Sequence, residues 1–408
     1  MVYTPTTWVN GSSPFINATN LQHIEQGIVD AQALIPSAGK GGMGAVLVAS
    51  NDASTLVKNA ADYVCDGTND QAEINAALID AAQNISSGPV GADYRGAVQL
   101  TGGRFFLGGS ILLQNASTLA GWGRLTELFP VSLSAVTGSG ANPACIKLST
   151  NTDHLTVVRD LRINLNAASG GSGHGINLDM TGSAATSTYP TMDPDADHLV
   201  TNVTIINGNN ATRHGIWFLQ DTGAHNRGSI ISDCQIRTCG GNGIRVENAS
   251  DMLITSVHMG GSGDYGYYIS GGNTMLFGNK SYFSDVGGYF LSAGRSLVSA
   301  CSSQDELTGF TINGANTTLS GCIVDTASDY AYQVNSNGVI ISGCYAFVRG
   351  GGRYATMTRG LYFPAAQAGC LINMSIDPSN VTTPLSGSFT GNRGQVINAD
   401  TGAVLASA

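Results

Sequence analysis

The chain is poor in charge. Charged residues make up 11% of its 408 residues, whereas an average soluble protein has about 25%. The 18 Lys and Arg residues form no cluster along the sequence, and the 28 Asp and Glu residues bring the net charge to −10. Because binding to nucleic-acid phosphates needs a basic face, a nucleic acid is not an expected partner.

Long apolar runs and paired cysteines are also missing. No apolar run approaches the roughly 20 residues that span a bilayer, so we expect no membrane insertion. The N-terminal stretch MVYTPTTWVNGSSPF lacks the basic start and apolar stretch of a signal peptide, which predicts synthesis in a cytoplasm. The eight cysteines include no CxxC pair, and the glycine-rich runs GGSGHG and GGNGI open strands rather than helices. We therefore expect no cofactor and no metal site, and no bound cation is indicated.

What the sequence has in excess is glycine, with 54 residues, and part of it recurs at a fixed interval. A small residue precedes an apolar strand in steps of 23, 22, 21 and 22 at Gly243, Gly266, Gly288, Gly309 and Ala331. A second series has steps of 23, 22, 22, 21 and 22 and comprises Cys234, Val257, Asn279, Cys301, Cys322 and Cys344. Two independent strands in each unit thus share one period.

A unit of 21 to 23 residues with short alternating strands predicts a parallel β-helix, in which each unit is one coil. Coils stack about 4.8 Å apart, so equivalent residues form ladders. The ladder expected to point inward comprises Ile176, Ile216, Ile244, Tyr267, Tyr289, Phe310, Tyr332 and Leu361. The cysteine series predicts a second interior ladder of small side chains, with disulfide bonds as the alternative.

A helix is predicted just before the first coils, which follow over residues 96–128. In the stretch DGTNDQAEINAALIDAAQ, Asp70 and Glu73 have the spacing of a capping box. One face of this helix is apolar and carries Ile74, Ala77, Leu78 and Ala81. The open end of a β-helix exposes strand edges and core, so we expect the helix to cover that end.

Residues 1–36 differ from the rest of the chain. Apolar residues recur there at the 3-4-3-4 spacing of a coiled-coil seam: Leu21, Ile24, Ile28, Ala31 and Ile35. Two heptads are too short to be stable alone, so this oligomerisation seam makes sense only if the bodies behind it also associate. The alternative is an amphipathic helix that packs on its own domain. The stretch PSAGKGGMG that follows predicts a flexible linker.

Two of these segments resemble a known family. The combination of ADYVCDGTNDQAEINAAL and GAVQLTGGRFFLGGSILLQNASTLAGWGR looks like the entry to the pectate-lyase-like β-helices of bacteriophage tail spikes and minor tail proteins. The leading TTWVNGSSPFINATNLQHIEQGI is similar to the N-terminal virion-attachment segment of phage tail and fibre proteins. The resemblance implies an all-β fold: a right-handed single-stranded parallel β-helix of the pectin-lyase type, with a short N-terminal helical segment and a capping helix.

The resemblance also implies partners and a location. A protein of this kind is a homotrimeric tail appendage of a virion, made in the bacterial host cytoplasm, that recognises a bacterial surface polysaccharide. It attaches to a phage tail or baseplate protein through residues 1–36. The implied organisation is an attachment and coiled-coil segment at 1–36, a linker at 37–45, a strand plus capping helix at 46–95, the parallel β-helix at 96–376 and a C-terminal cap at 377–408.

Alternation places the residue after each inward one on the outer surface. Successive coils then carry an exposed stripe of Trp217, Arg245, Tyr268 and Phe290. Exposed apolar stripes mark interfaces, and aromatic faces with an arginine suit sugar rings, acidic ones included, so we predict glycan contacts along this stripe. His258, from another outward row, is a further glycan-binding candidate. The alternative is burial against a neighbouring subunit or under the long loop before Gly215.

Two carboxylates on one outward row form the candidate catalytic pair. Asp179 and Glu247 have the coil of Leu219 between them, which separates them by two coil spacings, about 9.6 Å. Inverting glycoside hydrolysis uses carboxyl groups about 6.5–9.5 Å apart, and retaining hydrolysis about 5–5.5 Å. The pair lies near the upper limit for inversion, although any β-helix with 28 acidic residues offers some such pair.

The sequence leaves three functions open. The first is a phage tail appendage for host-surface glycan recognition, with or without depolymerase activity as a polysaccharide lyase or inverting glycoside hydrolase. The second is a free polysaccharide lyase or glycoside hydrolase, which would more often carry a secretion signal and lack a trimerising N-terminus. The third is a structural virion decoration without catalysis. The fold alone does not choose among them, because it hosts lyases, hydrolases, esterases and non-enzymes.

Overall fold

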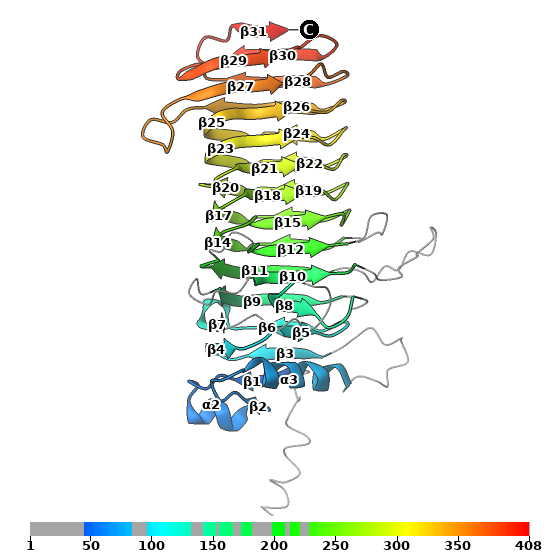
Figure 1. The fold of residues 1–408 in the computed structure, drawn as a ribbon, viewed down its shortest axis with the longest axis vertical. Helices are drawn as coiled ribbons and strands as arrows, with labels where there is room; N and C mark the ends of the chain where they lie inside the picture. The colour runs from blue at the N-terminus through cyan, green and yellow to red at the C-terminus, as the bar shows by residue number, and fades with distance from the viewer. Residues whose placement is uncertain are drawn as a thin grey trace, which may run out of the picture.

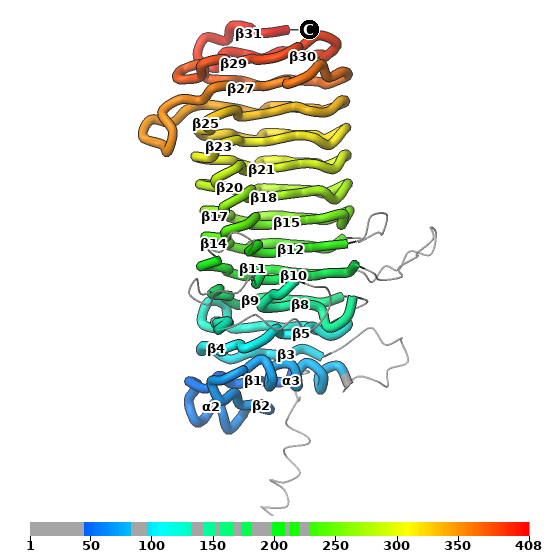
Figure 2. Tube along the Cα trace, in the orientation of Figure 1, coloured from blue at the N-terminus to red at the C-terminus, as the bar shows by residue number. Residues whose placement is uncertain are grey.

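The structure, a computed structural model, describes residues 45–83, 96–131, 142–151, 155–165, 173–181, 198–208, 213–220 and 228–407. Over these residues the chain winds into a long stack of coils, with the N-terminal coils at one end and the last strand at the other (Figure 1). The tube in Figure 2 follows the same winding from coil to coil. The predicted parallel β-helix is confirmed. The linker and the seam residues Leu21, Ile24, Ile28, Ala31 and Ile35 lie outside the described residues.

Each coil contributes strands to faces that we number as sheets 1, 2 and 3. Sheet 1 contains the strands that follow the repeated small residue. Its members are β5 (Ile111–Leu113), β8 (Ala144–Leu148), β10 (His174–Asp179), β12 (Ile216–Leu219), β15 (Ile244–Glu247), β18 (Tyr265–Ile269), β21 (Gly287–Leu291), the ends of β23 (Ser302–Ile312) and β25 (Ile323–Val334), β27 (Met357–Phe363) and β29 (Val381–Gly387).

Sheets 2 and 3 share several long strands that bend from one face to the next. Sheet 2 contains β1 (Ala45–Ala49), β3 (Ala97–Leu100), β6 (Thr118–Ala120), the starts of β9 (Val157–Asn164) and β11 (Leu199–Ile206), β13 (Ile230–Ser232), β16 (Leu253–Thr255), β19 (Met275–Phe277), β22 (Leu297–Ser299), β24 (Thr318–Ser320) and the starts of β26 (Ile340–Phe347), β28 (Leu371–Ile376) and β30 (Arg393–Asn398). Sheet 3 contains β4 (Gly103–Leu107), β7 (Thr126–Pro130), the ends of β9 and β11, β14 (Gln235–Cys239), β17 (His258–Ser262), β20 (Lys280–Tyr282), the starts of β23 and β25 and the end of β26.

The repeated glycine stands where successive coils come closest. A Cβ atom added at Gly215 would lie 2.6 Å from the carbonyl oxygen of Gly243 and 2.6 Å from Cγ2 of Ile236. Neither the backbone of the next coil nor a packed core side chain can withdraw easily. The small residue of the repeat is therefore required by the close approach of coils.

The predicted interior ladder is a continuous ring stack. Tyr267 and Tyr289 stack at 4.7 Å between ring centroids, Tyr289 and Phe310 at 4.4 Å, and Phe310 and Tyr332 at 5.3 Å, all nearly parallel. The Tyr267 hydroxyl donates to the carbonyl of Val257 at 2.6 Å, and the Tyr332 hydroxyl to that of Cys322 at 2.8 Å. The aromatic stack is thus tied to the cysteine series by hydrogen bonds.

The cysteine series is also interior, as predicted. All eight cysteines are buried free thiols, so the disulfide alternative is wrong. Asn279 occupies a cysteine position and is satisfied by its neighbours: its amide donates to the Ile254 carbonyl at 2.8 Å and accepts from the Val257 N–H at 2.9 Å. The residue before each member of the series has a left-handed φ, at Asp233, Ser256, Gly278, Ala300, Gly321 and Gly343.

The helix α3 (Gln71–Gln83) covers the N-terminal end of the stack, with the short helix α2 (Thr55–Ala60) and strand β2 (Tyr63–Val64) beside it (Figure 1). Its predicted apolar face is buried at Ile74, Ala77, Leu78 and Ala81. The predicted capping box between Asp70 and Glu73 is wrong about the partner of the Asp70 side chain. The Asp70 carboxylate accepts instead from the N–H groups of Gly67 at 2.8 Å and Phe106 at 2.7 Å, which joins the cap to β4.

The parallel stack continues beyond residue 376, where the sequence placed its end. β29 pairs with β27 and β30 with β28, both in parallel. Only the final strand β31 (Val404–Ser407) turns back antiparallel, against β30. In the described part of the chain, no helix is long and apolar enough to cross a bilayer.

Replacing Gly215 by Ala is expected to destabilise the fold by about 1–3 kcal/mol, because the added methyl overpacks a rigid contact. The matched control is Gly350→Ala in an open loop, where an added Cβ has no neighbour within 4 Å. Urea unfolding followed by circular dichroism measures both. Equal midpoints for the two variants would contradict the close-approach explanation.

Candidate functional site

The outer surface of sheet 1 carries side chains in register from coil to coil. The predicted stripe exists as one column, in which Asn177, Trp217, Arg245, Tyr268 and Phe290 are successive partners. The predicted carboxylates lie in a second column, as Asp179, Leu219 and Glu247. A third column precedes the repeated glycine and was missed from the sequence; it includes His174, His214, Asn242 and Tyr265.

Trp217 was predicted to be exposed, and that prediction is wrong. Its side chain is only 8% exposed. It packs edge-on against His174 at 4.9 Å and against His214 at 5.2 Å between ring centroids. The third column therefore covers this end of the stripe, and Trp217 acts as the floor of a cluster of polar side chains.

Arg245 is the centre of that cluster. Its guanidinium lies 5.0 Å from the Trp217 ring centroid and 5.3 Å from that of Tyr268. Its Nε donates to Oε1 of Glu247 at 2.9 Å, and its Nη2 donates to the same oxygen. The other Glu247 oxygen accepts from Trp217 Nε1 at 3.2 Å. The arginine is thus fixed by two rings and one carboxylate, with 29% of its side chain still exposed.

His174 and His214 form a stacked pair whose ring centroids are 4.9 Å apart. Burial is the main cause that lowers the pKa of His174 to about 4 and that of His214 to about 3, and the positive charge of Arg245 contributes to both shifts. Both imidazoles are therefore neutral near pH 7. Nδ1 of His174 accepts the His214 N–H at 3.0 Å, and Nδ1 of His214 accepts the Asn242 N–H at 2.8 Å.

These bonds assign the remaining ring proton of each histidine to Nε2. Nε2 of His214 lies 3.1 Å from Nη1 of Arg245, which also carries protons. Two N–H groups therefore face each other, an unfavourable contact that an acceptor oxygen bonded to both would relieve. This arrangement suits an oxygen acceptor from a ligand, such as a hydroxyl or a carboxylate.

The coils before Trp217 place further polar groups under this surface. Lys147 and Asn177 are fully buried in the outward column, and Asp179 is 2% exposed beside them. Burial lowers the pKa of Lys147, and the nearby Asp179 opposes that shift. Among the described residues, nothing bonds to either amide atom of Asn177. A buried amide without partners is the kind of group that a ligand or water satisfies.

The predicted catalytic pair is in the predicted register, with Leu219 between its members. Asp179 accepts hydrogen bonds from the backbone N–H and the hydroxyl of Thr181, at 3.0 and 2.6 Å. Glu247 is the ion-pair partner of Arg245. Each of the two carboxylates therefore already accepts hydrogen bonds from other residues of the chain. Catalysis by Asp179 and Glu247 stays a prediction.

Beyond Arg245 the stripe becomes an aromatic platform, defined here as Tyr265, Tyr268 and Phe290. Tyr268 and Phe290 stack at 5.0 Å with 13° between their planes, and Tyr265 lies 5.0 Å from Phe290. All three side chains are half-buried, so one face of the group is held by the protein and part remains open to solvent.

His258 is exposed, but it lies on a different face. It begins β17 and pairs with Gln235 and Lys280, which places it in sheet 3. The structure therefore does not bring it together with the stripe of sheet 1, and the glycan-binding candidates do not form one group.

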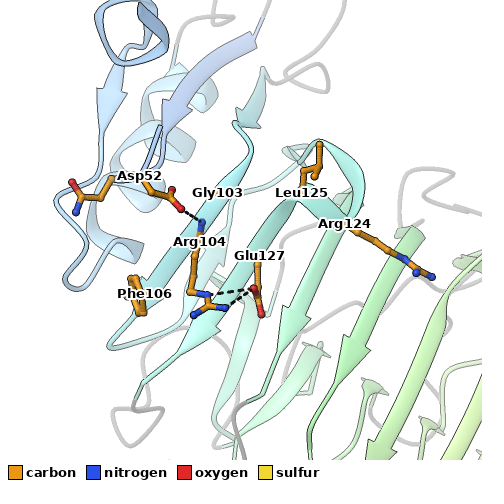
Figure 3. Close-up of a pocket in the computed structure, with 8 residues that line it drawn as sticks. Asp52, Gly103, Arg104, Phe106, Arg124, Leu125 and Glu127 are labelled. Atoms are coloured by element: carbon orange, nitrogen blue, oxygen red, sulfur yellow. Dashed lines mark hydrogen bonds and ion pairs between the residues drawn. The ribbon is translucent and has the colours of Figure 1, made fainter. Parts of the chain in front are cut away.

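A cleft of about 530 Å³ lies at the N-terminal end of sheet 3 (Figure 3). It is formed by β4, β7, the turn after β1 and the 3-10 helix η1 (Gly123–Leu125). Arg104 donates to Glu127 at 3.1 Å and lies 4.8 Å from the Phe129 ring centroid, while Arg124 reaches away to Gln235. This cleft was not predicted from the sequence, although Arg104 and Glu127 are one coil period apart.

One group of described residues has the composition of a metal site. The ligand atoms of Cys65, Asp70 and Glu73 all lie within 4.8 Å of one another. Both oxygens of Asp70 already accept backbone N–H groups, and burial raises the pKa of the Cys65 thiol. A neutral thiol is a poor metal ligand, so this group is explained as part of the cap.

Comparisons with known proteins agree with this fold. Residues 214–364 match the family described as the right handed beta helix region. Tailspike protein 2 from Escherichia coli O157:H7 bacteriophage CAB120 has a TM-score of 0.51 at 14% identity, covering 77% of this chain and 43% of that one. The A-module of the mannuronan C-5 epimerase AlgE6 of Azotobacter vinelandii has a TM-score of 0.51 at 13% identity, with coverages of 82% and 96%.

The gp42 tailspike of Acinetobacter phage vb_AbaP_AS12 also has a TM-score of 0.51, at 9% identity, with coverages of 76% and 58%. No curated protein matches the chain. At such identities the likeness defines the class, a right-handed parallel β-helix that phage tailspikes and polysaccharide-acting enzymes share. The predicted resemblance is confirmed at that level. The chain spans less than half of the CAB120 tailspike.

The histidine pair makes stability depend on pH. An unfolded histidine has a pKa near 6.5, whereas the folded values are about 4 for His174 and about 3 for His214. Between these limits the unfolded chain binds protons that the folded chain does not, so stability falls as the pH drops below about 6.5. His174→Asn should lose less stability than the wild type between about pH 7 and pH 4.5.

Thermal unfolding at the two pH values measures this difference. His258→Asn, on the exposed surface of sheet 3, is the control and should keep the wild-type dependence. A His174→Asn variant with the same dependence as the wild type would show that the buried pair does not stay neutral.

Proposed function

We propose that this protein is a tailspike-like appendage of a bacteriophage and that it binds a bacterial surface polysaccharide through the outer face of sheet 1. The observation that carries the proposal is the aromatic platform of Tyr265, Tyr268 and Phe290 beside Arg245. The shared fold of two phage tailspikes and the similarity of residues 1–36 to virion-attachment segments support the phage assignment. The proposed location is the tail of the virion.

The platform has the shape and chemistry that a sugar chain requires. Tyr268 and Phe290 stack on each other, so these half-buried rings offer apolar edges along the axis of the stack, and the apolar face of a pyranose ring can pack on such a surface. The convergent donors of Arg245 and His214 lie at one end of the platform, where they would bind sugar hydroxyl or carboxylate oxygens. Because Glu247 and Trp217 fix Arg245, little side-chain freedom is lost on binding.

The proposal includes an assembled state. Residues 1–36 hold the appendage to a tail or baseplate protein, and the bodies behind the predicted seam associate as a homotrimer. A trimer places three platforms on one particle. Weak single-site binding to a repeating polysaccharide then becomes strong through multivalency.

Replacing Tyr268 by Ala should weaken polysaccharide binding about tenfold, which corresponds to about 1.4 kcal/mol, because one ring of the platform is lost. The measurement is biolayer interferometry against a panel of purified bacterial lipopolysaccharides and capsular polysaccharides. The matched control is Tyr345→Ala, which removes a half-buried tyrosine stacked on Phe347 in sheet 3. Equal losses in both variants, or a wild type that binds no polysaccharide of the panel, would contradict the proposal.

Depolymerase activity is the second candidate, and the register of Asp179 and Glu247 favours it. If the pair is catalytic, the wild type should release new reducing ends, or products with the ultraviolet absorbance of unsaturated uronates, from the polysaccharide it binds. Asp179→Asn and Glu247→Gln should each reduce that rate at least a hundredfold, in line with loss of a general acid or base. Activity that survives both substitutions would remove the pair from consideration.

A further inference from the structure

The outer surface of sheet 2 carries a long column of apolar side chains. Seven of its eight members are apolar, and they are successive partners in the order Leu199, Ile230, Leu253, Met275, Leu297, Thr318, Ile340 and Leu371. Several are openly exposed: Met275 to 45%, Leu297 to 42% and Leu371 to 42%. Such exposure in one continuous line is unusual for a surface that faces only water.

The neighbouring column of the same sheet is uncharged as well. Its members are Thr201, Ser232, Thr255, Phe277, Ser299, Ser320, Ser342 and Asn373. Phe277 is 57% exposed. Charged residues occur only past the two ends of the columns, at Arg159 and Arg393. We call these two columns together the uncharged face.

The other outer surfaces differ from the uncharged face. Sheet 1 carries the Arg245–Glu247 pair and, further along, the Arg359–Asp329 pair. Sheet 3 carries Lys280 in the column of His258. On the described strands from β11 to β28, outward charge is therefore present on sheets 1 and 3 and absent from sheet 2, and the exposed charges nearest to it, Asp233, Asp251 and Arg295, lie in the turns at its edges.

We propose that the uncharged face packs against the same face of two further copies of this chain, in a parallel trimer around a three-fold axis. The proposal rests on the trimer of the proposed function and names its contact surface. Close to such an axis, each side chain lies near the same side chain of the other two copies. A charged side chain on that face would lie near the same charge of the other two copies and be repelled by it. In a chain of net charge −10, the strands of sheet 2 are the ones whose outer surface avoids this repulsion.

Two features select another copy of the chain over a different partner. The uncharged face runs from β11 to β28 along a straight stack of coils (Figure 1), which matches a second rod lying alongside. The predicted seam ends at Ile35, ten residues before β1 begins at Ala45, and a parallel coiled coil there would start the bodies level with one another. Equal heights then bring Leu297 of one copy to Leu297 of the next.

Docking by sheet 2 leaves the glycan surface free. The aromatic platform and Arg245 lie on the outer face of sheet 1, which belongs to a different side of each coil. The trimer would therefore present three open platforms, one on each copy.

The test is the oligomeric state of the full chain, measured by size-exclusion chromatography with light scattering. We expect the wild type to have three times the 42.0 kDa mass of one copy. Leu297→Arg should reduce the mass to that of a single copy. The matched control is Ile323→Arg, since Ile323 is also 42% exposed but begins β25 in sheet 3; this variant should remain a trimer.

Ser320→Arg, at a half-buried polar position of the uncharged face, provides a milder second disruption if Leu297→Arg fails to fold by circular dichroism. A wild-type monomer would overturn the proposal, as would trimers that survive both substitutions, because residues 1–36 would then suffice. Dissociation by Ile323→Arg alone would move the contact to sheet 3. Polysaccharide binding measured on a monomeric variant separates this outcome from failure of the glycan proposal.

Discussion

The structure depends on the parallel hydrogen bonding of each coil to the next. That bonding gives every residue a fixed height and fixed neighbours above and below it. It brings the backbones so close at the repeated glycine that a Cβ at Gly215 would meet the carbonyl of Gly243 at 2.6 Å. It also aligns the rings of Tyr267, Tyr289 and Phe310 inside the stack. Once the register is set, it also determines which outer side chains align in each column.

Because the columns are continuous, each side of the stack presents its own set of side chains over several coils. The outer face of sheet 1 combines the polar cluster around Arg245 with the aromatic platform. Sheet 2 carries the uncharged face, and sheet 3 carries the cleft of Arg104 and Glu127. A binding surface and an association surface can therefore coexist on one short repeat without competing for the same residues. The proposed separation of glycan binding on sheet 1 from subunit association on sheet 2 follows from this geometry.

Much of the fold could be predicted from the period of the sequence. The period fixed the interior ladder through Tyr267 and the row of Asp179, Leu219 and Glu247, because stacking transfers sequence spacing directly into space. Alternation could not predict exposure, which depends on neighbouring columns: Trp217 faces outward but is covered by His174 and His214. The column of His174 and His214 could have been predicted from the sequence, since both residues directly precede a repeated glycine. The left-handed φ of the residue before each member of the cysteine series could not be predicted, because Ala300 and Ser256 adopt it as well as glycine.

The central claim is that sugar rings bind over the platform of sheet 1. The most direct test is an experimental structure of the protein with an oligosaccharide cut from a polysaccharide that it binds. We expect density for sugar rings against Tyr265, Tyr268 and Phe290, with a sugar oxygen within hydrogen-bond distance of Arg245 and His214. Sugar bound instead in the cleft of Arg104, or along the column of His258, with the platform empty, would contradict it.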